Sequence, residues 1–199
     1  MKDGILIINK EKDMTSHDVV EKARKALSTK KIGHTGTLDP MATGVLVLCV
    51  GAATKLVDYL TCDEKIYDVE MQLGIRTDTG DITGTIIEEK DVNVVEQYKE
   101  VFKSFIGKQK QIPPMYSAIK KDGVKLYELA RKGIEIEREA RDIEIFDIYN
   151  ISDINDNKIR FSVHCSKGTY IRVLCEDIAV KLGTAATMVV IACVLMLLA

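Results

Sequence analysis

The sequence predicts a mixed α+β fold built mainly from antiparallel strands with flanking helices. Segments with a two-residue hydrophobic period alternate with segments whose apolar residues recur at helical spacing. Glycine and proline turn signals separate these segments at short intervals. The chain has 199 residues, 46% apolar and 29% charged, which suits one ordinary domain, or a large domain with a subdomain, that buries a core.

The first part of the chain predicts two strands, two helices and a glycine-rich loop. Thr15 and Asp18, three residues apart, form a capping-box pattern that starts the first helix. The predicted elements are, in order, a strand over 4–10, a helix from 15 to 27, a loop over 30–44, a strand over 45–50 and a helix over 53–60.

The remainder continues the alternation of strands and helices. Tyr67, Val69 and Met71 alternate with polar residues, which predicts a half-buried strand with Tyr67 on its apolar face. The later predicted elements are a turn over 77–84, a strand over 85–89, a helix over 94–105, a turn at Asp122-Gly123, a short helix over 126–130 ended by Gly133, two strands of which the second spans 159–165, and a helix over 171–182.

Composition excludes several functional classes. Lys plus Arg (28) nearly balances Asp plus Glu (30), so the chain does not hold nucleic acid by bulk charge. A local basic stretch remains at residues 103–133, with eight basic and two acidic side chains, which fits either a solvated surface or a phosphate-binding one. Five cysteines without a CxxC pair argue against a disulfide framework or structural zinc and favour the cytoplasm.

Residues 33–44 form a loop with the composition of a ligand-binding segment. Its three glycines allow the backbone to approach a ligand closely, and Pro40 holds the preceding Asp39 in an extended conformation. The pattern is neither a dinucleotide-binding motif nor a P-loop. Read alone, Asp-Pro is most often a simple turn.

This loop resembles the active-site pattern G-H-T-G-x-L-D-P-x-A-T-G of the TruB family of tRNA pseudouridine synthases. Three further blocks are similar in order and spacing: K-x-Y…L-G at 65–74, Q-x-P-P-x-Y-S-A at 111–118, and C-S-K-G-T-Y-I-R at 165–172. Asn9-Lys10 also fits the family's opening, and the likeness spans about residues 4–183. The resemblance implies the pseudouridine synthase fold and isomerisation of a uridine in the tRNA T-loop, position 55, without cofactor or metal.

The resemblance also implies the catalytic residues. Asp39 corresponds to the carboxylate beside the anomeric carbon, where it could attack the sugar, attack the base or remove a sugar proton. Tyr67 corresponds to the tyrosine that stacks on uracil and helps to remove the C5 proton. Arg172 corresponds to the arginine beside the carboxylate, which keeps that group ionised. Without the resemblance, Tyr67 reads as a core aromatic. A surface helix residue is the alternative for Arg172, but Ile171, Leu174 and Cys175 already define the apolar face of that helix and leave Arg172 free to point elsewhere.

The target base lies inside a folded RNA loop and must be extruded before the chemistry. His34 resembles the residue that fills the vacated space in the base stack. The basic stretch then becomes a contact for the RNA backbone of the T-stem-loop, with no obligatory protein partner. The other residues expected to bind RNA are Gly33, Thr35, Gly36, Leu38, Lys10, Lys120, Lys167 and Tyr170.

The match stops after Gly183, where family members continue with a Leu-x-Arg segment and a C-terminal RNA-binding PUA domain. We therefore expect an incomplete catalytic domain over 1–183 and an atypical tail over 184–199 that adds nothing to it. The tail is apolar from residue 188 onward, which fits a buried helix, a disrupted reading frame or, less well, a membrane anchor of about 20 residues. Three outcomes stay open: an active isomerase, a tRNA-binding and folding module, or an inactive remnant.

Overall fold

The computed structural model describes residues 3–61, 63–93 and 96–197. The chain divides into two compact units. The first unit comprises Met1–Val69, Ser162–Lys167 and Val190–Ala199, and the second comprises Glu70–Phe161 and Gly168–Val189. The fold is mixed α+β with a mainly antiparallel sheet, as the sequence predicts.

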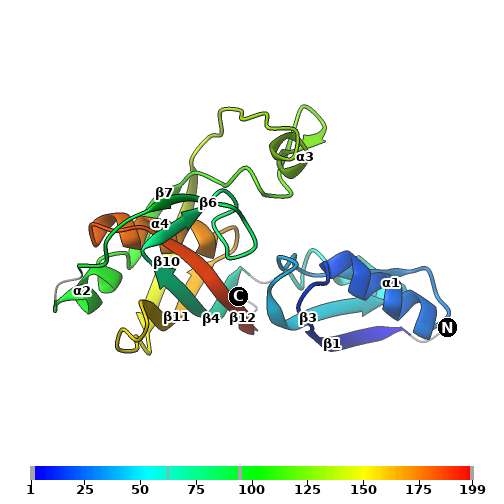
Figure 1. Cartoon of the computed structure of the whole chain (residues 1–199). Helices are drawn as coiled ribbons and strands as arrows, with labels where there is room; N and C mark the ends of the chain where they lie inside the picture. Colours follow the sequence, from blue (N-terminus) through cyan, green and yellow to red (C-terminus); the bar gives the residue numbers. More distant parts are fainter. Residues whose placement is uncertain (1–2, 62, 94–95, 198–199) are drawn as a thin grey trace. The chain divides into compact units, whose positions relative to one another are not determined.

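The first unit is a small sheet with one helix over it (Figure 1). The central strand β3 pairs antiparallel with β1 along its whole length and with the short β2 near its end, while β12 joins it in parallel at Thr43 and Gly44. The elements are β1 (Gly4–Lys10), α1 (Ser16–Ala26), β2 (Ile32–His34), β3 (Thr43–Val50) and a 3-10 helix, η1 (Gly51–Leu56).

The helix α1 begins at the predicted capping box. The Thr15 hydroxyl accepts a hydrogen bond from the Asp18 amide at 3.0 Å, and the Asp18 carboxylate accepts one from the Thr15 amide at 2.8 Å. The helix buries Val19 and Val20, and the β3 side chains Leu46 and Leu48 are fully buried. Two orphan amides at the helix start are thus satisfied, and the apolar faces of helix and sheet form the core of this unit.

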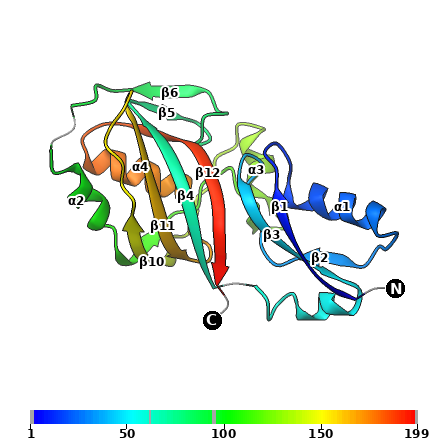
Figure 2. The same cartoon turned by 90° about the horizontal axis from the view of Figure 1, so that it is seen from below.

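The second unit contains a sheet in the order β12-β4-β11-β10-β7, with β10 antiparallel to β7. The helices α2 and α4 lie side by side on it (Figures 1 and 2), and Phe102 of α2 packs edge to face on Phe161 of β11, with ring centroids 5.1 Å apart. The long strands and helices are β4 (Glu64–Leu73), α2 (Tyr98–Lys103), β7 (Gly107–Gln111), β10 (Arg141–Tyr149), β11 (Lys158–Ser166), α4 (Ile171–Lys181) and β12 (Ala186–Leu197).

Two hairpins and a short helix complete the second unit. The hairpin of β8 and β9 turns at Asp122-Gly123, as predicted, and it stands off from the sheet together with α3 (Figure 1). These elements are β5 (Ile75–Thr77), β6 (Ile86–Glu89), β8 (Lys120–Lys121), β9 (Val124–Lys125) and α3 (Leu126–Ala130).

Three predicted elements differ from the structure. The loop over 30–44 contains the short strand β2, and the predicted helix over 53–60 is the 3-10 helix η1. The predicted helix over 94–105 is confirmed only as the shorter α2, and its expected start at residues 94–95 lies outside the described residues. Element ends are the least certain part of a periodicity argument, because they depend on caps and packing.

The described part of the tail, residues 184–197, is not a helix. Residues 186–197 form the strand β12 within the large sheet, and Ala185, Ala186, Thr187 and Met188 are buried. The β-branched run Val189, Val190, Ile191 favours a strand, since these side chains pack well on a pleated surface. No helix in the described part of the chain is long and apolar enough to cross a membrane.

Candidate active site

Hydrogen bonds of its own backbone fix the loop that carries Asp39 within the first unit. The Leu38 amide donates to the Ser16 hydroxyl at 2.9 Å, and that hydroxyl returns a bond to the Leu38 carbonyl at 3.4 Å. The Thr35 amide donates to the Val47 carbonyl of β3 at 3.0 Å. Leu38 itself is 3% exposed, so the residue before Asp39 is anchored in the core. Asp39 is thereby presented half-buried from a rigid loop.

Lys10 holds the same loop from the end of β1. Its side chain is buried, and its Nζ donates to the carbonyls of Glu11, Met14 and Pro40 at 2.9, 2.6 and 3.1 Å. Burial lowers the pKa of Lys10, and the charges of nearby carboxylates, first that of Asp39, oppose this shift. Lys10, which we expected to contact RNA, lies instead inside the protein and positions the Asp39-Pro40 turn.

We predict that Lys10→Met loosens this turn. Methionine fills a similar space but leaves three carbonyls without their donor, which should cost about 1–3 kcal/mol in the free energy of unfolding. A loosened turn should also speed hydrogen exchange of the Ala42 amide, which donates to the Asp39 carbonyl, by about tenfold. The exposed Lys12→Met serves as the control, and equal stability and exchange for the two variants would contradict this role.

The last glycine of the loop is required by a close approach of two backbones. Gly44 has φ of +100°, and a Cβ at this position would lie 2.1 Å from the carbonyl oxygen of Cys193 on β12. Gly33 is less constrained, because a Cβ there would meet only Val57 Cγ2 at 3.5 Å. The loop therefore ends at a site that admits only glycine, beside β12.

Tyr67 of β4 is 7% exposed and belongs to the same unit as Asp39. Burial is the main cause that raises the pKa of Tyr67 well above its usual value of about 10. The neighbouring Cys193 and Cys165 and the negative charge of Asp39 add to this shift. At neutral pH the side chain is therefore a phenol, which can stack on a ring or donate a hydrogen bond but is a weak base.

His34 and Lys167 lie at the ends of strands in the first unit. His34 is half-buried at the end of β2. Burial lowers the pKa of its ring, and a hydrogen bond with the Gly36 backbone only partly opposes this shift, so the ring is neutral at pH 7. Lys167 is exposed, its ammonium group pairs with Asp63, and its amide donates to the Asp63 carbonyl at 2.6 Å. A neutral ring suits stacking in RNA, whereas Lys167 is already partly neutralised.

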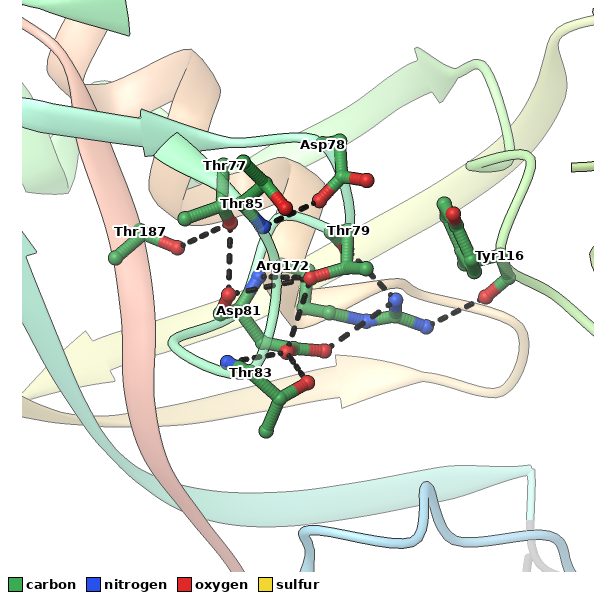
Figure 3. A network of polar contacts seen from close by, with 9 residues as sticks. All are labelled: Thr77, Asp78, Thr79, Asp81, Thr83, Thr85, Tyr116, Arg172 and Thr187. Atoms are coloured by element: carbon green, nitrogen blue, oxygen red, sulfur yellow. Dashed lines mark hydrogen bonds and ion pairs between the residues drawn. The ribbon is translucent and has the colours of Figure 1, made fainter. Parts of the chain in front are cut away.

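In the second unit Arg172 lies in the first turn of α4 and is 5% exposed. Its two terminal nitrogens donate to the carbonyls of Thr79 and Tyr116, each at 2.8 Å, and Asp81 Oδ2 lies 3.7 Å from Nη1 (Figure 3). The apolar face of α4 is buried as predicted, and Arg172 is buried as well rather than exposed on the helix surface. The guanidinium is a buried fork between two loops.

Asp81 is a functional candidate that the sequence reasoning missed. Its side chain is buried, and Oδ1 accepts hydrogen bonds from the Thr79 hydroxyl and the Thr83 amide, each at 3.0 Å, and from the Thr83 hydroxyl (Figure 3). It shapes the turn whose Thr79 carbonyl holds Arg172. The available signal was the run Thr-Asp-Thr-Gly-Asp-Ile-Thr-Gly-Thr over 77–85, in which two aspartates and two glycines are turn formers.

Tyr170 is fixed at the start of α4 by its backbone. The Gln111 side chain donates to the Tyr170 carbonyl at 3.1 Å and accepts from the Tyr170 amide at 2.8 Å. A cavity of about 530 Å³ opens in the same unit, and its lining includes Arg172, Tyr116 and Arg138. Among the described residues, no group of three His, Cys, Asp or Glu side chains is placed to hold a metal ion.

The basic stretch over 103–133 is partly neutralised by the fold. Lys110 pairs with Asp142 and Lys103 pairs with Asp147, each at 3.1 Å. Tyr127 has the cations of Lys125 and Arg131 each 5.3 Å from its ring centroid. Lys120, predicted to bind RNA, is exposed on β8.

Comparison with solved structures identifies the fold. The chain matches a subunit of a Cbf5-Nop10-Gar1 complex with a TM-score of 0.75 and 30% identity over 97% of this chain and 48% of that one. It matches an archaeal box H/ACA Nop10-Cbf5 complex with a TM-score of 0.69 and 26% identity, covering 97% and 47% of the two chains. The fold is therefore that of the pseudouridine synthases.

Comparison of sequences identifies the family. The profile described as TruB family pseudouridylate synthase (N terminal domain) matches residues 24–171, and the chain belongs to this family. Proteins named tRNA pseudouridine synthase B are 50% identical in Clostridium perfringens (93% of this chain, 64% of that protein), 54% in Fusobacterium nucleatum (94% and 65%) and 52% in Bacillus subtilis (94% and 63%). The chain thus spans less than two thirds of the length of these relatives.

Proposed function

We propose that this chain converts a uridine of the tRNA T-loop, at position 55, to pseudouridine. The observation that carries the proposal is the placement of Asp39 in a chain of this family: a carboxylate on a loop locked by Ser16 and Lys10, within electrostatic reach of the buried Tyr67. A carboxylate whose charge reaches a buried aromatic residue suits chemistry at a sugar carbon that bears a flat base.

The reaction is an isomerisation, so its atoms balance without a co-reactant. The bond from C1′ to N1 breaks, a bond from C1′ to C5 forms, the C5 proton is lost, and N1 takes up a proton. Asp39 supports this exchange by attack on C1′, by attack on the base or by removal of a sugar proton. Each of these routes uses an ionised carboxylate at the position of Asp39.

The raised pKa of Tyr67 favours one of the two roles expected of this residue, stacking on the base, over the other, removal of a proton. We assign the phenol ring the stacking role against uracil, because a flat apolar surface is what a buried tyrosine offers. Removal of the C5 proton by a resting Tyr67 phenolate is disfavoured, since the phenolate is not populated near neutral pH.

Each unit by itself offers side chains that suit contact with RNA. The neutral, half-buried ring of His34 suits a position in the base stack that the extruded uridine leaves. The exposed Lys120, and Lys125 and Arg131 around Tyr127, offer cations and one aromatic ring for the backbone and for unpaired bases. Arg172 enters the proposal through the family pattern and through the buried fork that fixes its guanidinium.

The test is tritium release from a T-stem-loop transcript labelled at C5 of its uridines, measured with the 199-residue chain. Transcripts with cytidine at position 55 provide the control, and pseudouridine is located by carbodiimide modification and primer extension. We expect release that reaches one equivalent from the uridine transcript and none from that position in the control. Binding of the transcript without release would instead identify a tRNA-binding and folding module.

A further inference from the structure

A chain of buried hydroxyls connects β12 with the turn that holds Arg172. The Thr187 hydroxyl lies 2.9 Å from that of Thr77, and the Thr77 hydroxyl donates to the Asp81 carbonyl at 2.7 Å (Figure 3). The Thr77 hydroxyl has one proton and gives it to Asp81, so Thr187 must be the donor to Thr77. Both side chains are almost completely buried, at 0% and 2% exposure, so water does not replace either bond.

Backbone bonds from the same strand bracket Asp81. The Met188 amide donates to the Gly80 carbonyl at 3.1 Å, and the Ile82 amide donates to the Met188 carbonyl at 2.9 Å. Asp81 and Met188 thereby form a parallel bridge. The turn is thus docked on β12 at the residue next to Thr187.

The docked turn carries an acceptor for Arg172. The carboxylate of Asp81 holds the Thr79 hydroxyl, and the carbonyl of the same Thr79 accepts the hydrogen bond from Arg172 Nη1 at 2.8 Å. The turn packs tightly against Arg172 at Gly80, where an added Cβ would lie 3.3 Å from Arg172 Cβ. A shift of the turn on β12 therefore moves the carbonyl that orients the guanidinium.

We infer that Thr187 is a positioning residue for Arg172, acting through Thr77 and the turn over 77–85. The inference rests on the proposed function only where turnover is the readout. It gives a role to a strand segment that we expected from the sequence to add nothing to the catalytic domain. Hydrogen bonds in such a dry chain polarise one another, so the loss of the first donor weakens the bond to the Asp81 carbonyl as well.

The neighbouring Thr184 supplies a matched control. It is 2% exposed, and its hydroxyl donates to the Asp91 carbonyl at 2.8 Å, away from the turn over 77–85. Thr184→Val and Thr187→Val each remove one buried hydroxyl without a change in side-chain shape. A purely structural role for Thr187 would make the two variants behave alike.

The experiment compares Thr187→Val, Thr187→Ser and Thr184→Val in the full chain. The first readout is the Nε–H resonance of Arg172 in NMR spectra, assigned from its loss in Arg172→Lys, together with hydrogen exchange of the Ile82 and Met188 amides. We expect Thr187→Val to shift the resonance and to speed both exchanges by about tenfold, Thr187→Ser to restore them, and Thr184→Val to leave them unchanged.

The second readout is turnover. Thr187→Val should lower the single-turnover rate at saturating RNA by about tenfold with the Kd for RNA unchanged, and Thr187→Ser should recover it. A parent chain without turnover would refute the proposed function alone, since the resonance and the exchange rates still report on Arg172. An unmoved Arg172 resonance in Thr187→Val, or the same shift in Thr184→Val, would overturn the inference.

Discussion

Asp39→Asn should abolish pseudouridine formation while the chain stays folded and still binds RNA. Asparagine keeps the size of the side chain and leaves the backbone bonds of the loop, including that from the Ala42 amide to the Asp39 carbonyl at 3.0 Å, intact. It removes the charge that every route at the anomeric carbon uses. We expect a fall in single-turnover rate of about four orders of magnitude or more, with the Kd for RNA changed by less than about threefold.

Asp13→Asn is the matched control for this loss of charge. Asp13 is exposed, its charge also acts on Lys10, and its amide donates to the Pro40 carbonyl at 2.9 Å. Its φ of +64° suits asparagine at least as well as aspartate, so the backbone is not strained. Pseudouridine formed by Asp39→Asn at a rate near that of Asp13→Asn would remove Asp39 from the chemistry.

Local sequence signals predicted the elements of this fold well where the structure follows from neighbours in the chain. The capping box at Thr15 and Asp18 starts α1, the Asp122-Gly123 turn joins β8 to β9, and the two-residue period after Tyr67 marks the buried face of β4. Each depends on contacts within a few residues or on one buried face. The residues that produce such signals are close together in the sequence, so the signals can be recognised without the structure.

The environments of the site residues could not be predicted, because their partners are distant in the sequence. Arg172 meets the Thr79 carbonyl 93 residues away, and Lys10 meets the Pro40 carbonyl 30 residues away. The family pattern pointed to Arg172 and Lys10, but not to the buried fork of the first or the scaffolding role of the second. Asp81 escaped notice because a turn of threonines, glycines and aspartates is typical of an exposed hairpin.

The last strand shows a different limit. An apolar run such as 188–199 has no period that separates a buried strand from a buried helix, and a strand is not among the structures that we expected for it from the sequence. The structure selects the strand β12, and the residues before the run, Thr184 and Thr187, supply buried hydroxyls to neighbouring turns. Hydroxyls in a core are informative only when their acceptors are known.

Arg172→Lys should lower the single-turnover rate by about a hundredfold or more, the second-largest effect that we expect. The guanidinium serves the Thr79 and Tyr116 carbonyls with two separate nitrogens, each at 2.8 Å. One ammonium group cannot reproduce this planar fork, so at least one buried carbonyl loses its donor and the two loops lose their common anchor. We expect a cost of about 1–3 kcal/mol in the free energy of unfolding.

Arg160→Lys is the control that separates the effect of the guanidinium geometry from the effect of the positive charge. Arg160 is exposed, with 77% of its side chain accessible, and pairs through Nε with Glu70 at 2.6 Å, a carboxylate that Lys158 also approaches at 3.7 Å. Lysine keeps the positive charge beside Glu70, whose side chain is 10% exposed, and Lys158 stays near the same carboxylate, so we expect the replacement to cost little. If Arg172→Lys reacts within threefold of Arg160→Lys at saturating RNA, the charge alone is sufficient and the fork geometry has no part in the reaction. A rate that falls with an unchanged Kd for RNA would place the fork in the transition state rather than in binding.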